Sequence, residues 1–293
     1  MSASALGQTM RENLLTRLGW SGGLGLLIIS GFALIGLIGP WLAPHDPAAI
    51  DPAHSFAAPS WQHPLGTDNL GRCLLSRLLY GTRLSLGTAV VATLIITTIG
   101  VTIGAVSGYY GGWLDGLLMR LVDILLAFPS LIIALAIVGT LGAGIANAII
   151  GLVCVWWVGY ARILRGMVLA SRAQPYVEAA QALGAGHGRI LWRHILPNVV
   201  SPVIVLVTLE LGQLILALAG LNFLGLGAQP PLAEWGSMLN AGRPFLQTAP
   251  QLMIYPGVTI AIVVLGFNLL GDSLRDLLDP YLRGKGALGS YGA

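Results

Sequence analysis

The sequence predicts an all-α protein that crosses a membrane six times. Of its 293 residues, 55% are hydrophobic and only 9% are charged, whereas soluble domains carry about 25% charged residues. The mean hydropathy is +0.80, and a soluble core of this size cannot bury that much apolar surface. The apolar residues also gather in runs long enough for membrane helices, which need about 20 residues each.

The expected spans are separated by loops rich in glycine, proline and polar residues. The spans cover residues 20–41, 84–107, 113–138, 147–167, 199–223 and 252–270. Because a proline inside a helix removes a backbone hydrogen bond, Pro129 should kink the third span. A short amphipathic helix is expected over Leu70–Arg83, and Glu210 is expected to interrupt the fifth span. The first run is too long for a signal-peptide core, so we expect it to be retained.

These spans form one expected membrane domain, residues 20–283, between short tails at residues 1–19 and 284–293. External loops are expected at residues 44–83 and 224–250, and an internal loop at residues 169–198. Positive residues favour the cytoplasmic side. With the N-terminus inside, that side holds Arg11, Arg17, Arg120, Arg162, Arg165, Arg172, Arg189, Arg193, Arg275, Arg283 and Lys285. The outside holds only Arg72, Arg77, Arg83 and Arg243, so both termini are expected in the cytoplasm.

The internal loop is a polar, basic island between apolar runs. Pro175 suits the first turn of a short helix that ends at Leu183, where Gly184 can adopt the positive φ of a helix stop. A second short helix is expected over Arg189–His194, closed by the Leu-Pro pair at residues 196–197. A short helix with a small-residue face can seat in a groove of another protein. The alternative is an ordinary loop between two membrane helices.

Few residues offer chemistry of their own. The Gly-x-x-x-x-Gly-Lys-Ser/Thr pattern is missing and Lys285 is the only lysine, so the chain is not expected to bind ATP through a P-loop. Glu210 lies in the middle of a span, where an ionisable group should face a cavity or a partner. Gln213, three residues later, is its nearest candidate partner. Glu210 is either a pathway carboxylate that contacts a cationic or polar substrate, or a hydrogen-bonded packing residue.

Other charged residues are expected to be structural. Asp123 should pair with Arg120 on the same helix face. A solvated helix end that could brace the internal loop is expected at Asp272, Arg275, Asp276 and Asp279.

The histidines and cysteines match no known metal or redox motif. His45, His54 and His63 share the external loop, which permits a weak metal-ion hypothesis, but isolated surface histidines and no metal site are expected. The histidines of the internal loop, His187 and His194, are expected to pack there. The chain has two cysteines, Cys73 and Cys154, which should be unpaired thiols.

Two sets of residues resemble a known family. Glu178-Ala179-Ala180, Gly184 and Leu196-Pro197 resemble the coupling-loop signature of bacterial ABC-importer permeases, although His194 stands where that signature usually has isoleucine. A second set of segments resembles the dipeptide/oligopeptide/nickel subfamily of these permeases. These segments are residues 65–72, 223–231, 234–236 and 267–276. These motifs extend from about residue 40 to residue 283. Cys73 departs from them, because the subfamily usually has aspartate at this position.

The resemblance implies the type I ABC-importer permease fold, as the "C-type" member of a permease pair in the bacterial cytoplasmic membrane. The implied partners are a second homologous permease, two ATP-binding subunits, an extracytoplasmic substrate-binding protein and the lipid bilayer, with no nucleic acid. This chain would hold no cofactor, because the ATP-binding subunits would hold ATP and Mg. The resemblance assigns docking on the ATPase to Glu178, Ala179, Ala180, Gly184, Leu196 and Pro197. It assigns an external gate or binding-protein contact to Gln229, Glu234 and Trp235.

The cargo that this resemblance favours is a di- or oligopeptide, because peptides are the commoner cargo of the subfamily. The same architecture importing nickel or a metal chelate is the alternative. A stand-alone channel or secondary transporter is an alternative of a different class, and it would need its own coupling-ion site. A membrane enzyme is disfavoured because the sequence shows no nucleophile–base or metal motif.

Overall fold

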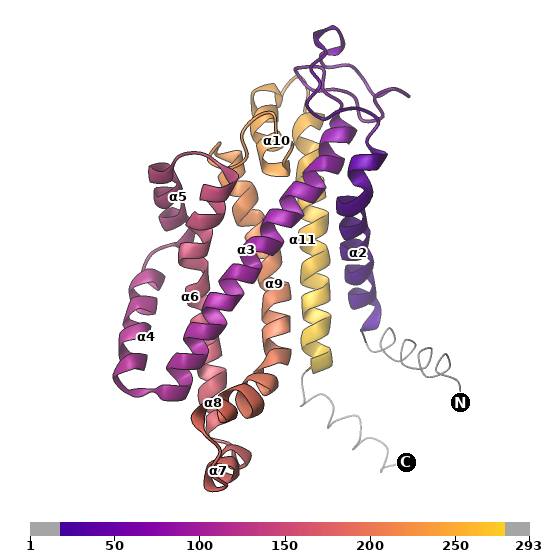
Figure 1. Ribbon diagram of the computed structural model, residues 1–293. Helices are drawn as coiled ribbons and strands as arrows, with labels where there is room; N and C mark the ends of the chain where they lie inside the picture. Colours follow the sequence, from indigo (N-terminus) through magenta and orange to yellow (C-terminus); the bar gives the residue numbers. More distant parts are fainter. Residues whose placement is uncertain (1–17, 279–293) are drawn as a thin grey trace, which may run out of the picture.

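The computed structural model describes residues 18–278, and the regular elements of this part are all helices. Figure 1 shows them as a bundle with a loop region at each end. The long helices are α2 (Gly19–Leu42), α3 (Leu74–Tyr110), α6 (Ile145–Arg172), α9 (Leu196–Phe223) and α11 (Gln251–Leu278). The shorter helices are α4 (Gly112–Leu126), α5 (Ser130–Leu141), α7 (Pro175–Ala182), α8 (His187–Ile190) and α10 (Trp235–Gly242). Short 3-10 turns occupy Pro52–His54 and Arg243–Phe245, and a π turn occupies Leu191–Ile195.

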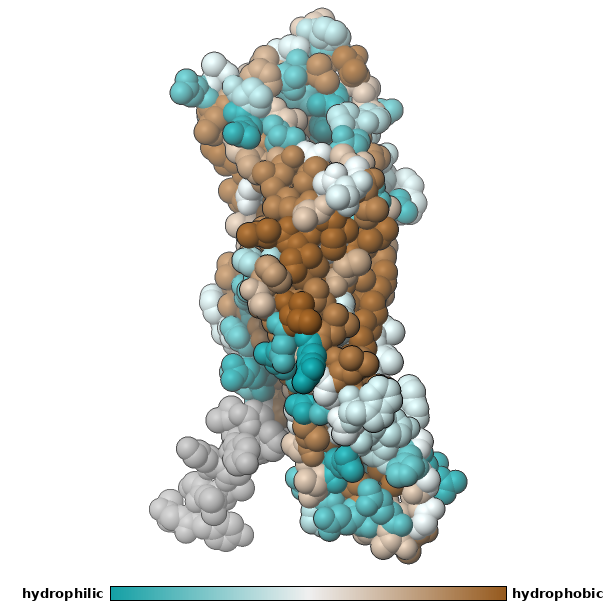
Figure 2. All heavy atoms as spheres, turned by 90° about the vertical axis from the view of Figure 1, so that its left-hand side faces the viewer, coloured by the Kyte–Doolittle hydropathy of each residue, from teal (hydrophilic) through white to brown (hydrophobic). Residues whose placement is uncertain are grey.

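The helices fit a chain that spans a membrane. Within residues 18–278, five helices are long and apolar enough to cross a bilayer, and α4 with α5 forms a sixth span if the pair is counted as one. The pair is bent by 86° at the break that contains Pro129, so the expected kink is a full interruption of the span. On the face that Figure 2 shows, hydrophobic residues cover most of the middle of the molecule and hydrophilic residues gather toward its two ends. The predicted class, an all-α polytopic membrane protein, is confirmed.

Helix α3 is longer than expected. Its 37 residues extend for about 55 Å at 1.5 Å per residue, well beyond a hydrocarbon core of about 30 Å. The separate amphipathic helix predicted over Leu70–Arg83 is therefore wrong, because Arg77 and Arg83 lie in the first turns of α3. Helix α3 continues through Gly81. Because this residue has no side chain, the Trp235 ring can pack closely against it. Helix α3 thus joins the two ends of the molecule (Figure 1).

Helices α3 and α6 cross at close range over three glycines, Gly100, Gly104 and Gly108. A Cβ atom on Gly104 would lie 2.6 Å from both the carbonyl oxygen of Ala161 and the Cβ of Leu164. Small residues four positions apart let the backbones of membrane helices approach in this way.

Charged side chains hold α4 against α6. Arg165 donates from Nε and Nη2 to the two carboxylate oxygens of Asp115, both at 2.6 Å, and Ser107 donates to the same carboxylate. Arg162 of α6 donates to Asp123 of α4. The predicted pairing of Asp123 with Arg120 is therefore wrong, because the neighbouring helix supplies the arginine.

Two helix boundaries also differ from the predictions. Helix α9 continues through Glu210 without interruption, because glutamate has a high helix propensity and one charge does not end a helix. Helix α11 extends to Leu278, so Asp272, Arg275 and Asp276 lie in its last turns. Asp279, Arg283 and Lys285 lie outside the described residues, and the bracing role of this charged set stays a prediction.

Candidate functional site

The internal loop contains the short helix expected after Pro175. Helix α7 begins at that proline and ends in a Schellman motif, in which the N–H groups of Gly184 and Ala185 donate to the carbonyls of Gln181 and Ala180 at 2.9 and 3.0 Å. Gly184 has a φ of +79°. This left-handed conformation strains any residue with a Cβ atom, which explains the glycine at this position.

The two faces of α7 have different surroundings. Val177 and Ala180 are buried in a small core that includes Tyr109 at the end of α3 and Val168 of α6. Ala180, predicted to dock on another subunit, therefore turns inward, whereas Glu178 and Ala179 are exposed.

Leu183 was missed by the sequence reasoning. It follows the helix and is 89% exposed, which gives the end of α7 an unpartnered apolar side chain within the described chain. Helical periodicity would place it on the buried face with Ala180. Because α7 ends at Ala182, the chain leaves the helix before that periodicity applies.

The rest of the loop leads directly into α9. Helix α8 ends at Ile190, the π turn that follows it ends at Ile195, and Leu196 then begins α9. The expectation that the Leu-Pro pair closes the second short helix is therefore wrong. Pro197 instead occupies the first turn of α9, where the missing N–H of proline has no helical acceptor to lose. Leu196 is partly buried against the core of the loop, and Pro197 is exposed.

Polar contacts attach the loop to three long helices. The hydroxyl of Tyr109, on α3, lies 3.0 Å from Nδ1 of His187. Arg172, at the end of α6, donates to the carbonyl of Tyr109 at 2.8 Å. Asn198, on α9, donates to the hydroxyl of Tyr176 at 3.1 Å. His187 thus contacts the end of α3, although it is exposed. Helix α7 itself is joined to α9 through Tyr176, and to α3 and α6 through the hydrophobic core of the loop.

Glu210 lines a cavity in the middle of the bundle. The cavity has a volume of about 320 Å³, and the indole N–H of Trp156 donates to Oε2 of Glu210 at 3.3 Å. Gln213 lines the same cavity, but the hydrogen-bond donor to Glu210 is Trp156 on α6 and not Gln213. Leu126 and Ser130, on either side of the break at Pro129, border the same space. The broken span and the carboxylate therefore belong to one site.

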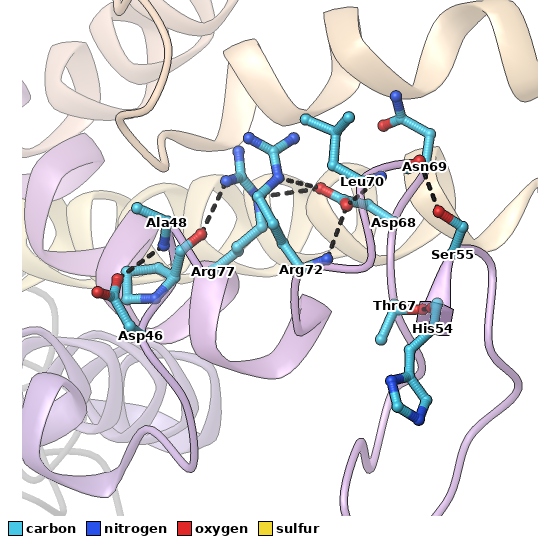
Figure 3. Close-up of polar contacts among 11 residues, drawn as sticks. Asp46, Ala48, His54, Ser55, Thr67, Asp68, Asn69, Leu70, Arg72 and Arg77 are labelled. Carbon is cyan, nitrogen blue, oxygen red and sulfur yellow. Dashed lines mark hydrogen bonds and ion pairs between the residues drawn. The ribbon is translucent and has the colours of Figure 1, made fainter. Parts of the chain in front are cut away.

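At the end of the molecule opposite the internal loop, a buried ionic network fixes the external loop (Figure 3). Asp68 accepts from the backbone N–H of Arg72 at 3.0 Å and from its Nε at 2.7 Å. Nε of Arg77 lies 3.7 Å from the same carboxylate, and its Nη1 donates to the carbonyl of Pro47 at 3.0 Å. The start of the external loop is thereby joined to the first turns of α3.

Glu234 and Trp235 attach α10 to α3. Glu234 caps α10 by accepting from the N–H of Ser237 at 2.8 Å, and it accepts from the hydroxyl of Ser85 at 2.9 Å. Burial raises the pKa of the Glu234 carboxyl because the charged form loses hydration, although these hydrogen bonds oppose the shift. The Trp235 side chain is fully buried.

Gln229 differs from these two residues, because it is exposed and lines a cavity of about 220 Å³ with Arg72 and Arg77. An external gate or binding-protein contact stays a prediction for Gln229. Glu234 and Trp235 offer no surface for such a contact in this conformation.

The external histidines are not isolated. The rings of His45 and His63 stack with centroids 4.6 Å apart, and the ring of His54 lies 5.9 Å from that of His63. The expectation of scattered surface histidines is therefore wrong. Cys73 and Cys154 are free cysteines, as expected.

Comparison with known proteins agrees with this architecture. The family "Binding-protein-dependent transport system inner membrane component" matches residues 100–284, and the "N-terminal TM domain of oligopeptide transport permease C" matches residues 21–59.

The similar proteins are named for the transport of three different cargoes. The dipeptide transport system permease of Alkalihalophilus pseudofirmus is 45% identical over 89% of this chain and 86% of its own length. The nickel transport system permease of Escherichia coli is 43% identical over 90% and 95%. The glutathione transport system permease of Shigella flexneri is 46% identical over 86% and 83%. The chain belongs to the family of binding-protein-dependent inner-membrane permeases, as a non-catalytic, multi-pass subunit of an ABC importer of the peptide, nickel and glutathione group.

Proposed function

We propose that this permease moves di- or oligopeptides across the cytoplasmic membrane. The observation that carries the proposal is the cavity beside Glu210. The carboxylate of Glu210 can accept hydrogen bonds from the charged amino end of a peptide, and the Gln213 amide, which lines the same cavity, offers a further polar contact. Free peptides always carry such an amino end, and a charge-assisted hydrogen bond to it gives about 1.5–3 kcal/mol.

The same cavity gives less support to a bare nickel ion. Nickel prefers imidazole or thiolate ligands, and no histidine or cysteine is among the described residues that line this space. Two of the named relatives also carry peptide cargo in their names, since glutathione is a tripeptide. Import of nickel as an organic chelate is the second candidate, favoured by the relative named for nickel transport. Membership of the importer family leaves the stand-alone channel or secondary transporter without support.

ATP hydrolysis would take place on separate subunits. We infer that a second homologous permease completes the pathway, and that one of two ATP-binding subunits docks on the internal loop of this chain through the exposed face of α7, while the other docks on the corresponding loop of the second permease. A substrate-binding protein would deliver peptides to the external end. This arrangement places the internal loop, and with it both termini, in the cytoplasm. The hydrophobic core that α7 shares with α3 and α6, and the Asn198–Tyr176 hydrogen bond to α9, support the loop as the mechanical link.

The test is peptide uptake in cells that lack the chain, after restoring either the original protein or Glu210→Gln. The substitution removes the charge and keeps an oxygen that can accept from Trp156. We expect uptake of a labelled dipeptide to fall about 10- to 100-fold. An N-acetylated dipeptide, which lacks the charged amino end, should be transported poorly by both proteins and nearly equally.

Two results would overturn the proposal. Rescue of nickel uptake without rescue of peptide uptake would assign the second candidate. Full peptide uptake by Glu210→Gln, with the same preference for free amino ends, would remove Glu210 from the pathway.

A further inference from the structure

Three metal-ligating side chains converge from the start, the middle and the end of the segment that joins α2 to α3. His45 lies just after α2, His63 in the middle of the loop, and Cys73 is the N-cap residue of α3. One ligand atom from each of the three lies within 4.8 Å of the others. This cluster is separate from the cavity beside Glu210, and neither the family nor the relatives' names assign a role to it.

The backbone holds these three positions in place. The N–H of His45 donates to the hydroxyl of Ser76 in α3 at 3.1 Å. The carbonyl of His63 accepts from the N–H of Gly66 at 2.8 Å, and the carbonyl of Gly66 accepts from Leu74 at 3.1 Å. The contact of Arg77 with the Pro47 carbonyl, drawn in Figure 3, holds the segment that follows His45. The ligands are therefore largely pre-positioned before an ion arrives.

The ring of His63 has an unexplained nitrogen. Its Nδ1 atom is buried and has no hydrogen-bond partner among the described residues. Buried polar atoms almost always have a partner, and an exception calls for an explanation such as an ion. Cys73 adds a thiol that is only 2% exposed and forms no disulfide. Together, a ring nitrogen without a hydrogen-bond partner and a buried thiol provide nitrogen and sulfur donors.

We propose that His45, His63 and Cys73 bind one divalent transition-metal ion of the zinc, nickel and cobalt class. Tetrahedral zinc sites have bonds of about 2.0–2.1 Å to nitrogen and about 2.3 Å to sulfur, which separate the ligand atoms by about 3.3–3.6 Å. The three ligand atoms in this cluster lie within 4.8 Å of one another, so side-chain rotations that move them by about 1 Å would bring them to these separations. Two imidazoles and one thiolate form a set that these ions prefer over the oxygen ligands of Mg²⁺ or Ca²⁺. Water would complete the fourth position.

A bound ion would clip the external loop together. It would join the end of α2 to the start of α3 through the middle of the loop, next to the segment that the Asp68–Arg72 ion pair already fixes. Ordering the loop in this way makes the external surface more rigid, because metal binding couples directly to local folding. The site stands whether the cargo is a peptide or a chelate, since the ion acts on the loop and not in the pathway.

The probe is Co²⁺, titrated under anaerobic, reducing conditions into the full chain purified with its copurifying subunits through a tag without histidine. A cobalt–thiolate bond gives a charge-transfer absorption, and tetrahedral geometry gives strong visible bands. We expect one Co²⁺ per chain with both signals. Zn²⁺ should displace the cobalt and abolish the absorption.

Four variants make the test specific. Cys73→Asp, which places a favoured N-cap residue before α3 and should keep the loop folded, is expected to lose the charge-transfer band. His63→Gln is expected to weaken cobalt binding at least 100-fold, since even loss of an outer contact to a ligand costs 10- to 100-fold. His54→Ala and Cys154→Ser are matched controls, because Nδ1 of His54 is bonded to Asp51 at 2.6 Å and Cys154 lies on α6. Both controls should bind cobalt normally.

The proposal is overturned by a titration without a charge-transfer band. It is also overturned if Cys73→Asp keeps the band, if folded His63→Gln binds as tightly as the original protein, or if Cys154→Ser loses the band. None of these readouts depends on transport, so they stand apart from the test of the cargo.

Discussion

Leu183 gives the sharpest test of the internal loop as the docking element. Its side chain is 89% exposed at the end of α7, and it makes no part of the loop's core. If an ATP-binding subunit covers it, Leu183→Ala removes three buried carbon atoms from the interface. At about 0.8 kcal/mol for each carbon, the loss is about 2.4 kcal/mol, or roughly 50-fold in affinity.

The assay is the affinity of the purified ATP-binding subunit for the permease in detergent, with ATP-driven uptake measured in parallel. Leu224→Ala is the matched control, because Leu224 is 53% exposed but follows α9 at the external end of the molecule. We expect about 50-fold weaker binding and low uptake for Leu183→Ala, with normal binding for Leu224→Ala. Thermal stability of the permease should not change, since the side chain is exposed. Unchanged affinity after Leu183→Ala would refute the assignment of this surface to docking.

Two further predictions concern the fold that supports the sites. Gly104→Leu should lower the free energy of unfolding by about 3 kcal/mol, because a Cβ there would clash with the α6 backbone. Thermal unfolding in detergent measures this loss, and Gly31→Leu, with open space around it, should be tolerated. Equal stability of the two variants would contradict the close crossing of α3 and α6. Ser85→Ala should cost about 1–3 kcal/mol, because it removes the hydroxyl that bonds to the buried Glu234 carboxylate and accepts from the α10 backbone. The same unfolding experiment on Thr88→Ala should show a smaller loss; this hydroxyl donates within its own helix.

Local sequence signals predicted much of the fold. The apolar runs located the spans, Pro129 located the break, and Pro175 with Gly184 located both ends of α7. These features depend on residues close in sequence, through the fixed φ of proline and the positive φ that glycine tolerates.

Contacts between helices were not predictable in the same way. Asp123 pairs with Arg162 of α6 and not with the arginine one turn away, and Glu210 accepts from Trp156 of α6 and not from Gln213. Both partners depend on how the helices cross, which a single sequence does not show. The burial of Trp235 has the same origin, since its pocket is made by α2 and α3.

ATP-driven transport of peptides through this chain can be measured in a reconstituted system. The most direct measurement is accumulation of a labelled dipeptide in proteoliposomes that contain the chain, its partner permease, the ATP-binding subunits and the binding protein, with labelled nickel offered in parallel. We expect dipeptide accumulation that requires ATP, falls about 10- to 100-fold with Glu210→Gln, and is not matched by nickel. Accumulation of nickel alone, or of dipeptide without ATP, would contradict it.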